Sequence, residues 1–295
     1  MKSLPIFDIV LTIYNQENLI DRVLRGVFRN TTTPFNLILV FDGCTDNTEK
    51  KAMKYIYKKK PKLLIQTIVK HAANVYETKA NNIGFKNALT DFMITLQDDM
   101  VINEYGWERR LTYPLRKFSD VIAVTGRTAQ DVGLIDNPSN QEYFINQVSR
   151  ELKNLPRNVF AVRDSINRGP VAFNMKYLRD MNYLDEAYAP SDLDDADLCL
   201  RAWEKNKLRC GAYWIDYISR REWGKARSKD SDMYRENHIP KNATLLKKRH
   251  EKYIISGKNH DQDIVIPESE IDYIPQRKIA SILQHVFYRI FKPRF

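Results

Sequence analysis

"DFMITLQDDM", residues 91–100, is the stretch that decides the fold. An apolar run ends there in two adjacent carboxylates, Asp98 and Asp99. The run has the length and the apolar content of a strand that is buried on both faces. Adjacent carboxylates repel each other and favour water, so their place directly after a buried strand indicates that they bind something.

The same arrangement occurs twice earlier in the chain. Residues 7–15 and 36–41 are apolar, β-branched runs that lead into the polar segments YNQEN and DGCTDN, and residues 16–30 between them have helical spacing. A third strand is expected over residues 62–69. Strands that alternate with helices predict an open α/β sheet, in which ligands collect at the carboxyl ends of the strands. One polar cluster is explained by a solvated turn, whereas three at one sheet edge indicate a binding site.

A second acidic cluster lies in SDLDDADLCLRAWEKNK, residues 191–207. The spacing predicts a helix whose first turn contains Asp194, Asp195 and Asp197. The helix dipole favours a carboxylate at this end by roughly 0.3–1 kcal/mol, so capping explains one or two of them but does not need three. Between the two acidic clusters we expect helices over 107–118 and 141–155, a short strand over 121–126, and a strand passing into a helix over 168–181.

The ordered clusters resemble the family 2 glycosyltransferases from about residue 6 to residue 224. The family's Pro-Thr-Tyr-Asn with a nearby Glu corresponds to TIYNQE, and its Asp-Asp-Gly-Ser-Thr-Asp to FDGCTDNT. Its Asn-x-Gly-x-x-x-Ala-Arg-Asn-x-Gly corresponds to NVYETKANNIG, with Tyr76 in place of Gly and Asn81 in place of Arg. Its Asp-x-Asp metal motif falls on residues 97–99, with Gln97 in the first position. Its Glu-Asp-x-Asp-Leu-x-x-Arg, the most specific match, corresponds to residues 194–201.

The resemblance implies the fold and its division. We expect an α/β protein with the A-type glycosyltransferase (Rossmann-like) fold, a mixed and mostly parallel sheet flanked by helices. Residues 1–105 would form the nucleotide-sugar-binding half, and residues 106–224 the acceptor-binding and catalytic half of the same domain. Residues 225–295 would form a basic helical extension.

The resemblance also implies roles for residues of the first half. It assigns nucleotide binding to Tyr14, Asn15, Glu17, Asp42, Lys79, Asn82 and Asp98. Tyr14 would pack on the base, Asp42 would accept its hydrogen bonds, and Lys79 would take the place of the missing Arg at the diphosphate. Asp99 is the predicted ligand of a divalent cation, Mn²⁺ or Mg²⁺, since hard oxygen ligands suit both ions.

In the second half, the resemblance makes Asp195 the general base of an inverting transfer. It assigns contacts with the acceptor or donor sugar to Arg168, Gly169, Asp194 and Asp197. Many members have a His about 25 residues after the base, where this chain has SRREWG, residues 219–224. Arg220 or Arg221 would neutralise diphosphate oxygens there, and His238 is a later candidate for the metal ligand.

The predicted function is transfer of a sugar from a UDP-, GDP- or dTDP-sugar to a hydroxyl of a glycan or lipid-linked acceptor, in cell-surface polysaccharide or glycan biosynthesis. A sugar-phosphate nucleotidyltransferase is the alternative enzyme, but it is expected to have a Gly-rich phosphate loop, and TIYNQEN contains no Gly. A non-enzymatic, basic nucleic-acid-binding protein is the other alternative. The basic residues lie mostly outside the motif-bearing region, so we expect no nucleic acid partner. The absence of GxGxxG after the first strand argues against a dehydrogenase.

The charge and composition of the chain indicate which partners it binds and where in the cell it works. The formal charge is +10, which suggests anionic partners. The three cysteines lack CxxC spacing and predict free thiols. Without a leader or a long apolar run, a cytoplasmic protein is expected. Residues 277–295 have the pattern of a basic amphipathic helix, which would lie on the anionic cytoplasmic face of a membrane or pack on the catalytic body.

Overall fold

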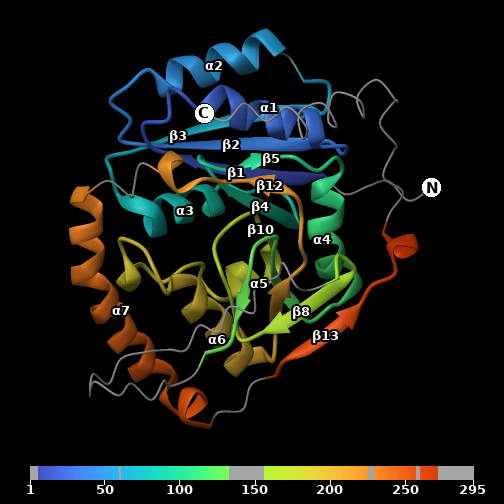
Figure 1. The fold of residues 1–295 in the computed structure, drawn as a ribbon, viewed down its shortest axis with the longest axis vertical. Coiled ribbons are helices and arrows are strands. Elements are labelled where there is room, and N and C mark those ends of the chain that lie inside the picture. Colours follow the sequence, from blue (N-terminus) through green and yellow to red (C-terminus); the bar gives the residue numbers. More distant parts are fainter. Residues whose placement is uncertain (1–5, 60, 133–155, 225–228, 257–259, 272–295) are drawn as a thin grey trace.

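The computed structural model describes residues 6–59, 61–132, 156–224, 229–256 and 260–271 (Figure 1). Two expected helices, over residues 141–155 and 277–295, lie outside the described residues. The described elements form one central sheet with helices on both of its faces.

The central sheet has nine strands in the order β13-β8-β11-β6-β10-β4-β1-β2-β3. Strands β1 to β4 are parallel to one another, β10 is antiparallel to both β4 and β6, and β11 is parallel to β6. Since β8 is antiparallel to β11 and β13, only β8 and β10 among these strands run against the rest. The expected mixed, mostly parallel sheet is confirmed. Its strands are β1 (Phe7–Ile13), β2 (Phe35–Asp42), β3 (Leu64–Ala72), β4 (Phe92–Gln97), β6 (Val121–Thr125), β8 (Val159–Arg163), β10 (Val171–Asn174), β11 (Arg209–Ala212) and β13 (Gln262–Val265).

Two layers of helices bury the two faces of this sheet, as Figure 1 shows. Alternate residues of β1 point to opposite faces: Leu11 packs into the core of one face and Val10 into that of the other. The first core is closed by α1 (Ile20–Asn30), α2 (Thr48–Lys59) and α4 (Trp107–Lys117). The second is closed by α3 (Tyr76–Lys86), α5 (Met175–Asp180) and α6 (Asp194–Asn206). Burial on both faces explains why the central strands read as continuous apolar runs.

Within the described ranges, two short strand pairs and three 3-10 turns complete the body. Strand β5 (Val101–Ile102) pairs with β12 (Tyr217–Ile218), and β7 (Ala129–Gln130) pairs with β9 (Ser165–Ile166). The β5–β12 pair brings the chain that follows β11 back to the carboxyl end of β4. The 3-10 turns are η2 (Glu186–Tyr188), η3 (Arg221–Trp223) and η5 (Glu268–Glu270).

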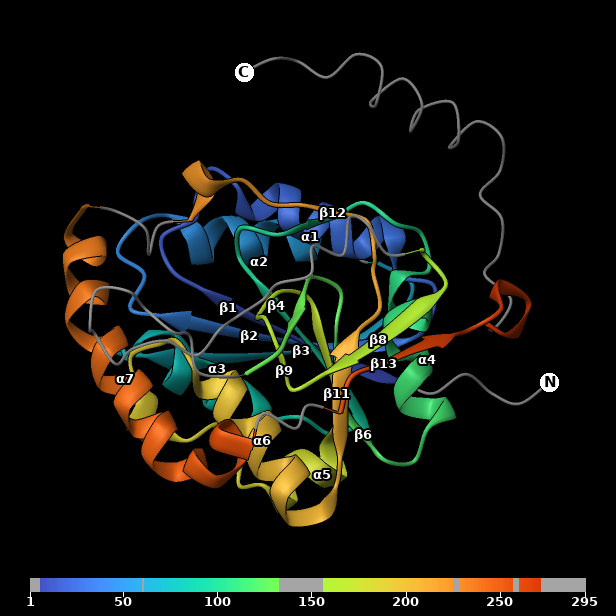
Figure 2. The ribbon, with the colours of Figure 1, turned by 60° about the horizontal axis from the view of Figure 1, so that its bottom comes forward.

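The C-terminal part is built into the body. Helix α7 (Lys229–Ser256) lies beside α6, where Leu246 and Ile254 pack with Leu200, and β13 adds an edge strand to β8 (Figure 2). The predicted helical extension therefore contains a strand of the sheet, which the sequence pattern did not indicate. Among the helices of the described residues, none has the length and apolar character needed to cross a bilayer.

Candidate functional site

The carboxyl ends of β1 and β4 are tied together around Asp98. The amide of Tyr14 donates to Asp98 Oδ2 at 2.7 Å, and Gln16 Nε2 lies 3.4 Å from Asp98 Oδ1. The same Gln16 amide donates to the carbonyl of Trp223 at 2.7 Å, and the guanidinium of Arg220 lies 5.3 Å from the Trp223 ring. The segment of residues 219–224 is thus at the edge of the sheet where the first acidic pair lies.

The electrostatic environment of the acidic pair favours the neutral form of one carboxyl. Burial raises the pKa of Asp98 to about 8, while the hydrogen bond from the Tyr14 amide opposes the shift and the charge of Asp99 adds to it. Asp99 itself is buried, with 6% of its surface exposed. A divalent cation at this place would stabilise the ionised forms of both carboxyls.

Asp98 and Asp99 could hold a metal ion only together with further ligands from a bound substrate. In the part of the chain that the structure describes, no three or more His, Cys, Asp or Glu side chains are grouped to hold a metal. Mg²⁺ is often held by one or two carboxylates together with substrate phosphates. Asp98 and Asp99 therefore fit a cation that is shared with a phosphate-bearing substrate.

Asn15 and Glu17 fasten the loop that follows β2. Asn15 Oδ1 accepts from the amide of Thr45 at 2.8 Å and lies 3.3 Å from that of Asp46. Glu17 Oε2 accepts from the amide of Asn47 at 3.3 Å. Asn15 adopts a left-handed backbone conformation, with φ of 48°, which Asn tolerates better than most residues. Both side chains therefore hold the loop after β2 against the carboxyl end of β1.

The side chains of Asp42 and Asn82 also form hydrogen bonds with backbone groups. The two carboxylate oxygens of Asp42 accept from the amides of Val75 and Tyr76, at 2.6 and 2.8 Å. Asn82 is 2% exposed, and its amide exchanges two hydrogen bonds with the backbone of Leu184, at 2.9 and 3.1 Å. These contacts favour a scaffolding role for both residues over direct contact with a base or a phosphate.

Two other residues of the predicted nucleotide site have side chains at the surface. Tyr14 is 37% exposed at the end of β1, and Lys79 is exposed on α3. Their exposure is compatible with the predicted contacts with a base and a diphosphate.

The second acidic cluster lies at the N-terminus of α6. Asp194 is fully buried, and it accepts from Thr78 Oγ1 at 2.7 Å and from the guanidinium of Arg168. Asp195 is half-buried, with Oδ1 accepting from the amide of Ala196 at 2.9 Å. Burial raises the pKa of Asp195 to about 7; the charge of Arg168 opposes this and that of Asp194 adds to it. Asp195 is thus poised to exchange a proton near neutral pH.

Glu77 on α3 joins the two acidic clusters. Its Oε1 accepts from Gln97 Nε2 at 2.5 Å and pairs with Arg168 Nη1 at 2.9 Å, and the same Arg168 pairs with the first carboxylate of α6. The charge of Glu77 contributes to the raised pKa of both Asp98 and Asp195. Carboxylates that are far apart in the sequence therefore converge on one side of α3. Glu77 is not among the residues that the sequence motifs indicate.

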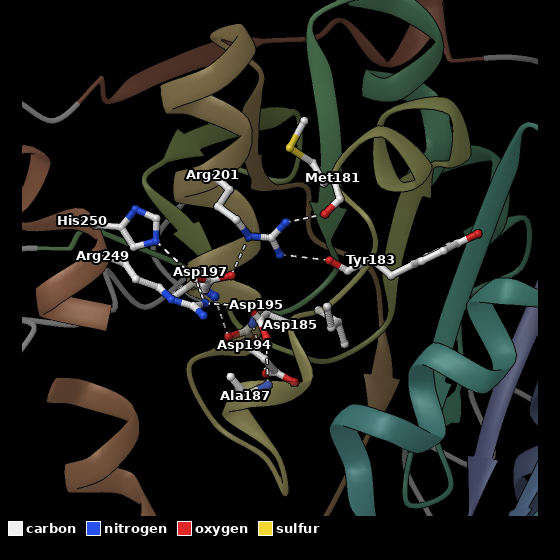
Figure 3. A network of polar contacts seen from close by, with 12 residues as sticks. Met181, Tyr183, Asp185, Ala187, Asp194, Asp195, Asp197, Arg201, Arg249 and His250 are labelled. Atoms are coloured by element: carbon white, nitrogen blue, oxygen red, sulfur yellow. Dashed lines mark hydrogen bonds and ion pairs between the residues drawn. The ribbon is translucent and has the colours of Figure 1, made fainter. Parts of the chain in front are cut away.

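Asp197 has a different environment from Asp195, one that Figure 3 shows. It is fully buried, with Oδ2 accepting from Arg201 Nε at 2.6 Å and Oδ1 lying 3.2 Å from Arg249 Nη1 and 3.3 Å from His250 Nε2. Burial acts to raise its pKa, but the bonds from His250 and Arg201 outweigh burial and lower the pKa to about 2. Asp197 thus fastens α6 to α7, which favours a structural role over the predicted sugar contact. Of these three partners of Asp197, only Arg201 could be predicted from the sequence, because it lies one helical turn away on the same helix.

Gly169 allows a close approach of two loops. A Cβ atom at this position would lie 2.9 Å from Cβ of Arg127, whose Nη1 donates to the carbonyl of Arg168 at 2.9 Å. A larger residue would push the Arg168 loop away. Gly169 therefore contributes to the site by positioning Arg168.

Two of the predicted residues remain. The side chain of Arg221 lies outside the described residues. His238 lies on α7, with Nε2 3.5 Å from Asp192 Oδ2, so it belongs to the α6 side of the site and not to the Asp99 side.

Comparison with known proteins gives a family match and several structural likenesses. The family model described as "Glycosyl transferase family 2" matches residues 8–174. Glucosyl-3-phosphoglycerate synthase from Mycobacterium tuberculosis, solved with Mn²⁺, UDP-glucose and phosphoglyceric acid, has a TM-score of 0.53 at 14% identity over 82% of this chain and 79% of that chain. GalNAc-T7, solved with UDP, GalNAc and Mn²⁺, has a TM-score of 0.55 at 15% identity over 80% of this chain and 48% of that chain.

A third structure is longer than this chain. TarS from S. aureus has a TM-score of 0.48 at 16% identity over 72% of this chain, and this chain covers 36% of TarS. The chain thus spans about a third of the length of that protein. A search among curated protein sequences finds no significant match.

Proposed function

The chain belongs to glycosyl transferase family 2, and from this premise we propose that it is an inverting enzyme. It would move a sugar from a nucleotide-diphosphate sugar to a hydroxyl of a glycan or lipid-linked acceptor in the synthesis of a cell-surface polysaccharide or glycan. Use of a nucleotide sugar follows from the family and from neighbours that share the A-type glycosyltransferase fold. The inverting course and the acceptor are our proposals.

One observation supports this function best: the convergence of the two acidic clusters through Glu77 and Arg168. Asp98 and Asp99 would meet the nucleotide diphosphate at the ends of β1 and β4. Asp195 would meet the acceptor at the N-terminus of α6. A donor and an acceptor bound at these two places would lie on either side of the Glu77–Arg168 pair.

In the proposed reaction, Asp195 accepts the proton of the acceptor hydroxyl. The hydroxyl oxygen forms a bond to the anomeric carbon from the face opposite the nucleotide, and the bond between that carbon and the diphosphate oxygen breaks. The configuration at the anomeric carbon is thereby inverted. A pKa of about 7 suits Asp195 to this role, because a base of this strength is substantially ionised at neutral pH and still accepts a proton readily.

Asp99, with Asp98 beside it, would hold a Mn²⁺ or Mg²⁺ ion together with the donor diphosphate. When bound, such an ion neutralises negative charge that develops on the leaving diphosphate. Lys79 and the arginines Arg220 and Arg221 would add positive charge to the same group. The M. tuberculosis neighbour has been solved with Mn²⁺ and with Mg²⁺ in the presence of UDP, which supports this proposal.

The donor is identified by a thermal-shift screen of UDP-, GDP-, dTDP- and CMP-sugars with and without Mn²⁺. A ligand that binds only the native state raises the apparent stability, by about 2.7 kcal/mol at a concentration 100 times its Kd. We expect one nucleotide class to raise the melting temperature, and to do so more strongly with Mn²⁺. Release of the nucleoside diphosphate is then measured with Asp195→Asn as the inactive control. If no nucleotide sugar binds, the proposed function is wrong.

The division of the chain and its location are further proposals. We propose that residues 1–105 bind the donor, that residues 106–224 bind the acceptor, and that the protein lies on the cytoplasmic face of a membrane through residues 277–295. Deletion of residues 277–295 is expected to abolish sedimentation with vesicles that contain phosphatidylserine. Equal sedimentation of the full and shortened chains would contradict this.

A further inference from the structure

We propose that α7 positions the catalytic base: it holds the loop before α6 and the first turn of α6 where Asp195 needs them. This inference rests on the proposed function of Asp195. The family match ends at residue 174, so both α6 and α7 lie outside it. Four observations about α7, the segment before α6 and the first turn of α6 carry the inference.

The first observation is that Asn242 of α7 holds the loop of residues 186–193, which leads into α6, in place. Its side chain is fully buried, and its Nδ2 lies 2.8, 2.9 and 3.1 Å from the carbonyl oxygens of Tyr188, Ser191 and Asp192, so its two N–H groups are shared among three acceptors. Asp192 and Leu193 have φ values of 71° and 67°, a left-handed conformation that is strained for a residue other than glycine. Such a loop persists only where its surroundings hold it, and Asn242 supplies that hold.

The second observation is that Arg249 joins the two sides of this loop. Its Nη1 lies 2.6 Å from Asp185 Oδ2, before the loop, and 3.2 Å from Asp197 Oδ1, after it (Figure 3). The guanidinium also lies 5.4 Å from the ring centroid of Tyr188, within the loop. One side chain of α7 thus contacts the start, the middle and the end of the segment that carries the base.

The third observation is that His250 completes the attachment from the next position of α7. Its ring is 2% exposed and lies between Asp197 Oδ1 at 3.3 Å and Glu204 Oε2 at 2.8 Å. Glu204 lies near the C-terminal end of α6 and Asp197 in its first turn. His250 therefore holds α6 at two points along its length, which fixes the direction of the helix as well as the place of its first turn.

The fourth observation is that α7 reaches Asp195 through other residues. Asp197 is two residues from Asp195 on the same helical turn. The charged groups that act on Asp195 come from other elements: Arg168 from the loop before β10, Asp194 from α6 and Glu77 from α3. Asp98 and Gln97, at the proposed donor site, are held by contacts among β1, β4 and α3 and the residues that follow these elements. Loss of the α7 contacts should therefore displace the base and leave donor binding intact.

The test compares two substitutions that each remove one positive charge from α7. Arg249→Met removes the contacts described above, and Lys248→Met removes an exposed charge at the adjacent position. With the nucleotide sugar selected by the thermal-shift screen, Arg249→Met should lower kcat by about 10- to 100-fold, since a misplacement of about 1 Å costs about that much. The KM for the donor should stay within about twofold, and Lys248→Met should resemble the unchanged protein. Arg249→Lys, which keeps the charge, should recover part of the lost kcat.

A second measurement does not depend on activity. Hydrogen exchange of backbone amides should become faster over residues 188–198 in Arg249→Met, with no change at the ends of β1 and β4, and should not change in Lys248→Met. If Arg249→Met does not fold, Arg249→Gln, which keeps a donor but loses the charge, replaces it with the same expected direction.

The outcomes separate the two proposals. If the unchanged protein transfers no sugar, the proposed function fails, and hydrogen exchange still decides whether α7 holds the α6 turn. If the unchanged protein is active and Asp195→Asn is not, an unaltered kcat in Arg249→Met overturns the positioning role. An equal loss of donor affinity and kcat in Arg249→Met overturns it as well, because that result would indicate general damage to the fold.

Discussion

The substitution Asp197→Asn tests the attachment of α6 to α7 through its dependence on pH. Asp197 is fully buried, which acts to raise its pKa, but its contacts with His250 and Arg201 outweigh burial and hold the pKa near 2, against an ordinary value of 3.8. A carboxyl whose pKa is lower in the folded state stabilises the fold above its unfolded pKa. That stabilisation is lost as the pH falls through the folded pKa.

The size of the effect follows from the shift. A difference of roughly two pH units corresponds to about 2–3 kcal/mol, at about 1.4 kcal/mol per unit. Removing one partner of a buried ion pair typically costs about 3–5 kcal/mol, because the remaining charges lose their counter-ion. Asp197→Asn should therefore lower the free energy of unfolding by about 2–5 kcal/mol at pH 7. The difference from the unchanged protein should shrink by about 2 kcal/mol between pH 5 and pH 2, where Asp197 itself becomes protonated.

The assay is urea unfolding followed by circular dichroism at pH 7, 5, 3 and 2. The matched control is Asp180→Asn, at an exposed carboxylate at the end of α5, which should change the free energy of unfolding by about 0.5 kcal/mol or less. A difference for Asp197→Asn that does not vary with pH would refute the low pKa. A difference as small as that of the control would refute the attachment itself.

Four further predictions concern the reaction. Asp195→Asn should abolish transfer and keep the donor affinity measured by calorimetry, and loss of both would remove Asp195 from the role of base. In the unchanged enzyme, kcat/KM should rise about tenfold per pH unit up to about pH 7 and then level off, because the base must be ionised. Arg168→Gln should move this rise to higher pH, since the positive charge of Arg168 holds the pKa of Asp195 down; a profile that stays in place would contradict the pairing. Asp99→Ala should weaken the binding of UDP in the presence of Mn²⁺ much more than in its absence, and an equal loss in both conditions would exclude Asp99 as the metal ligand.

The central strands could be predicted from sequence because their burial leaves a local signal. Strands β1, β2 and β4 are buried on both faces and read as apolar runs of six to eight residues. Strand β11 has no such signal: its four residues, RCGA, are a strand because β6 and β8 pair on both of its edges. At Gly211, a Cβ atom would lie 2.3 Å from the carbonyl oxygen of Ala161, so the glycine is explained only by a neighbour that is distant in the sequence.

The same limit applies to the site. Asp98, Asp99 and Asp195 could be selected because each follows a recognisable strand end or helix start. Glu77 could not, because its importance depends on Gln97 and Arg168, which approach it only in the folded chain. Arg249 and His250 were equally hidden, within a basic stretch whose local composition indicates only a solvated helix face.

The two carboxylates of α6 show how one helical turn serves two purposes. Asp197 meets three cationic or ring N–H partners, and these outweigh the cost of its burial, so it stays ionised and holds the helix in place. Asp195 is also desolvated, but it shares Arg168 with Asp194 and Glu77, so burial prevails and its pKa rises to about 7. Groups whose surroundings push their pKa values apart are suited to different chemical roles. Part of the difference comes from α7, because Arg249 and His250 contact Asp197, and part comes from Arg201 of α6 itself. The same α7 contacts hold the helical turn that carries Asp195, the proposed base.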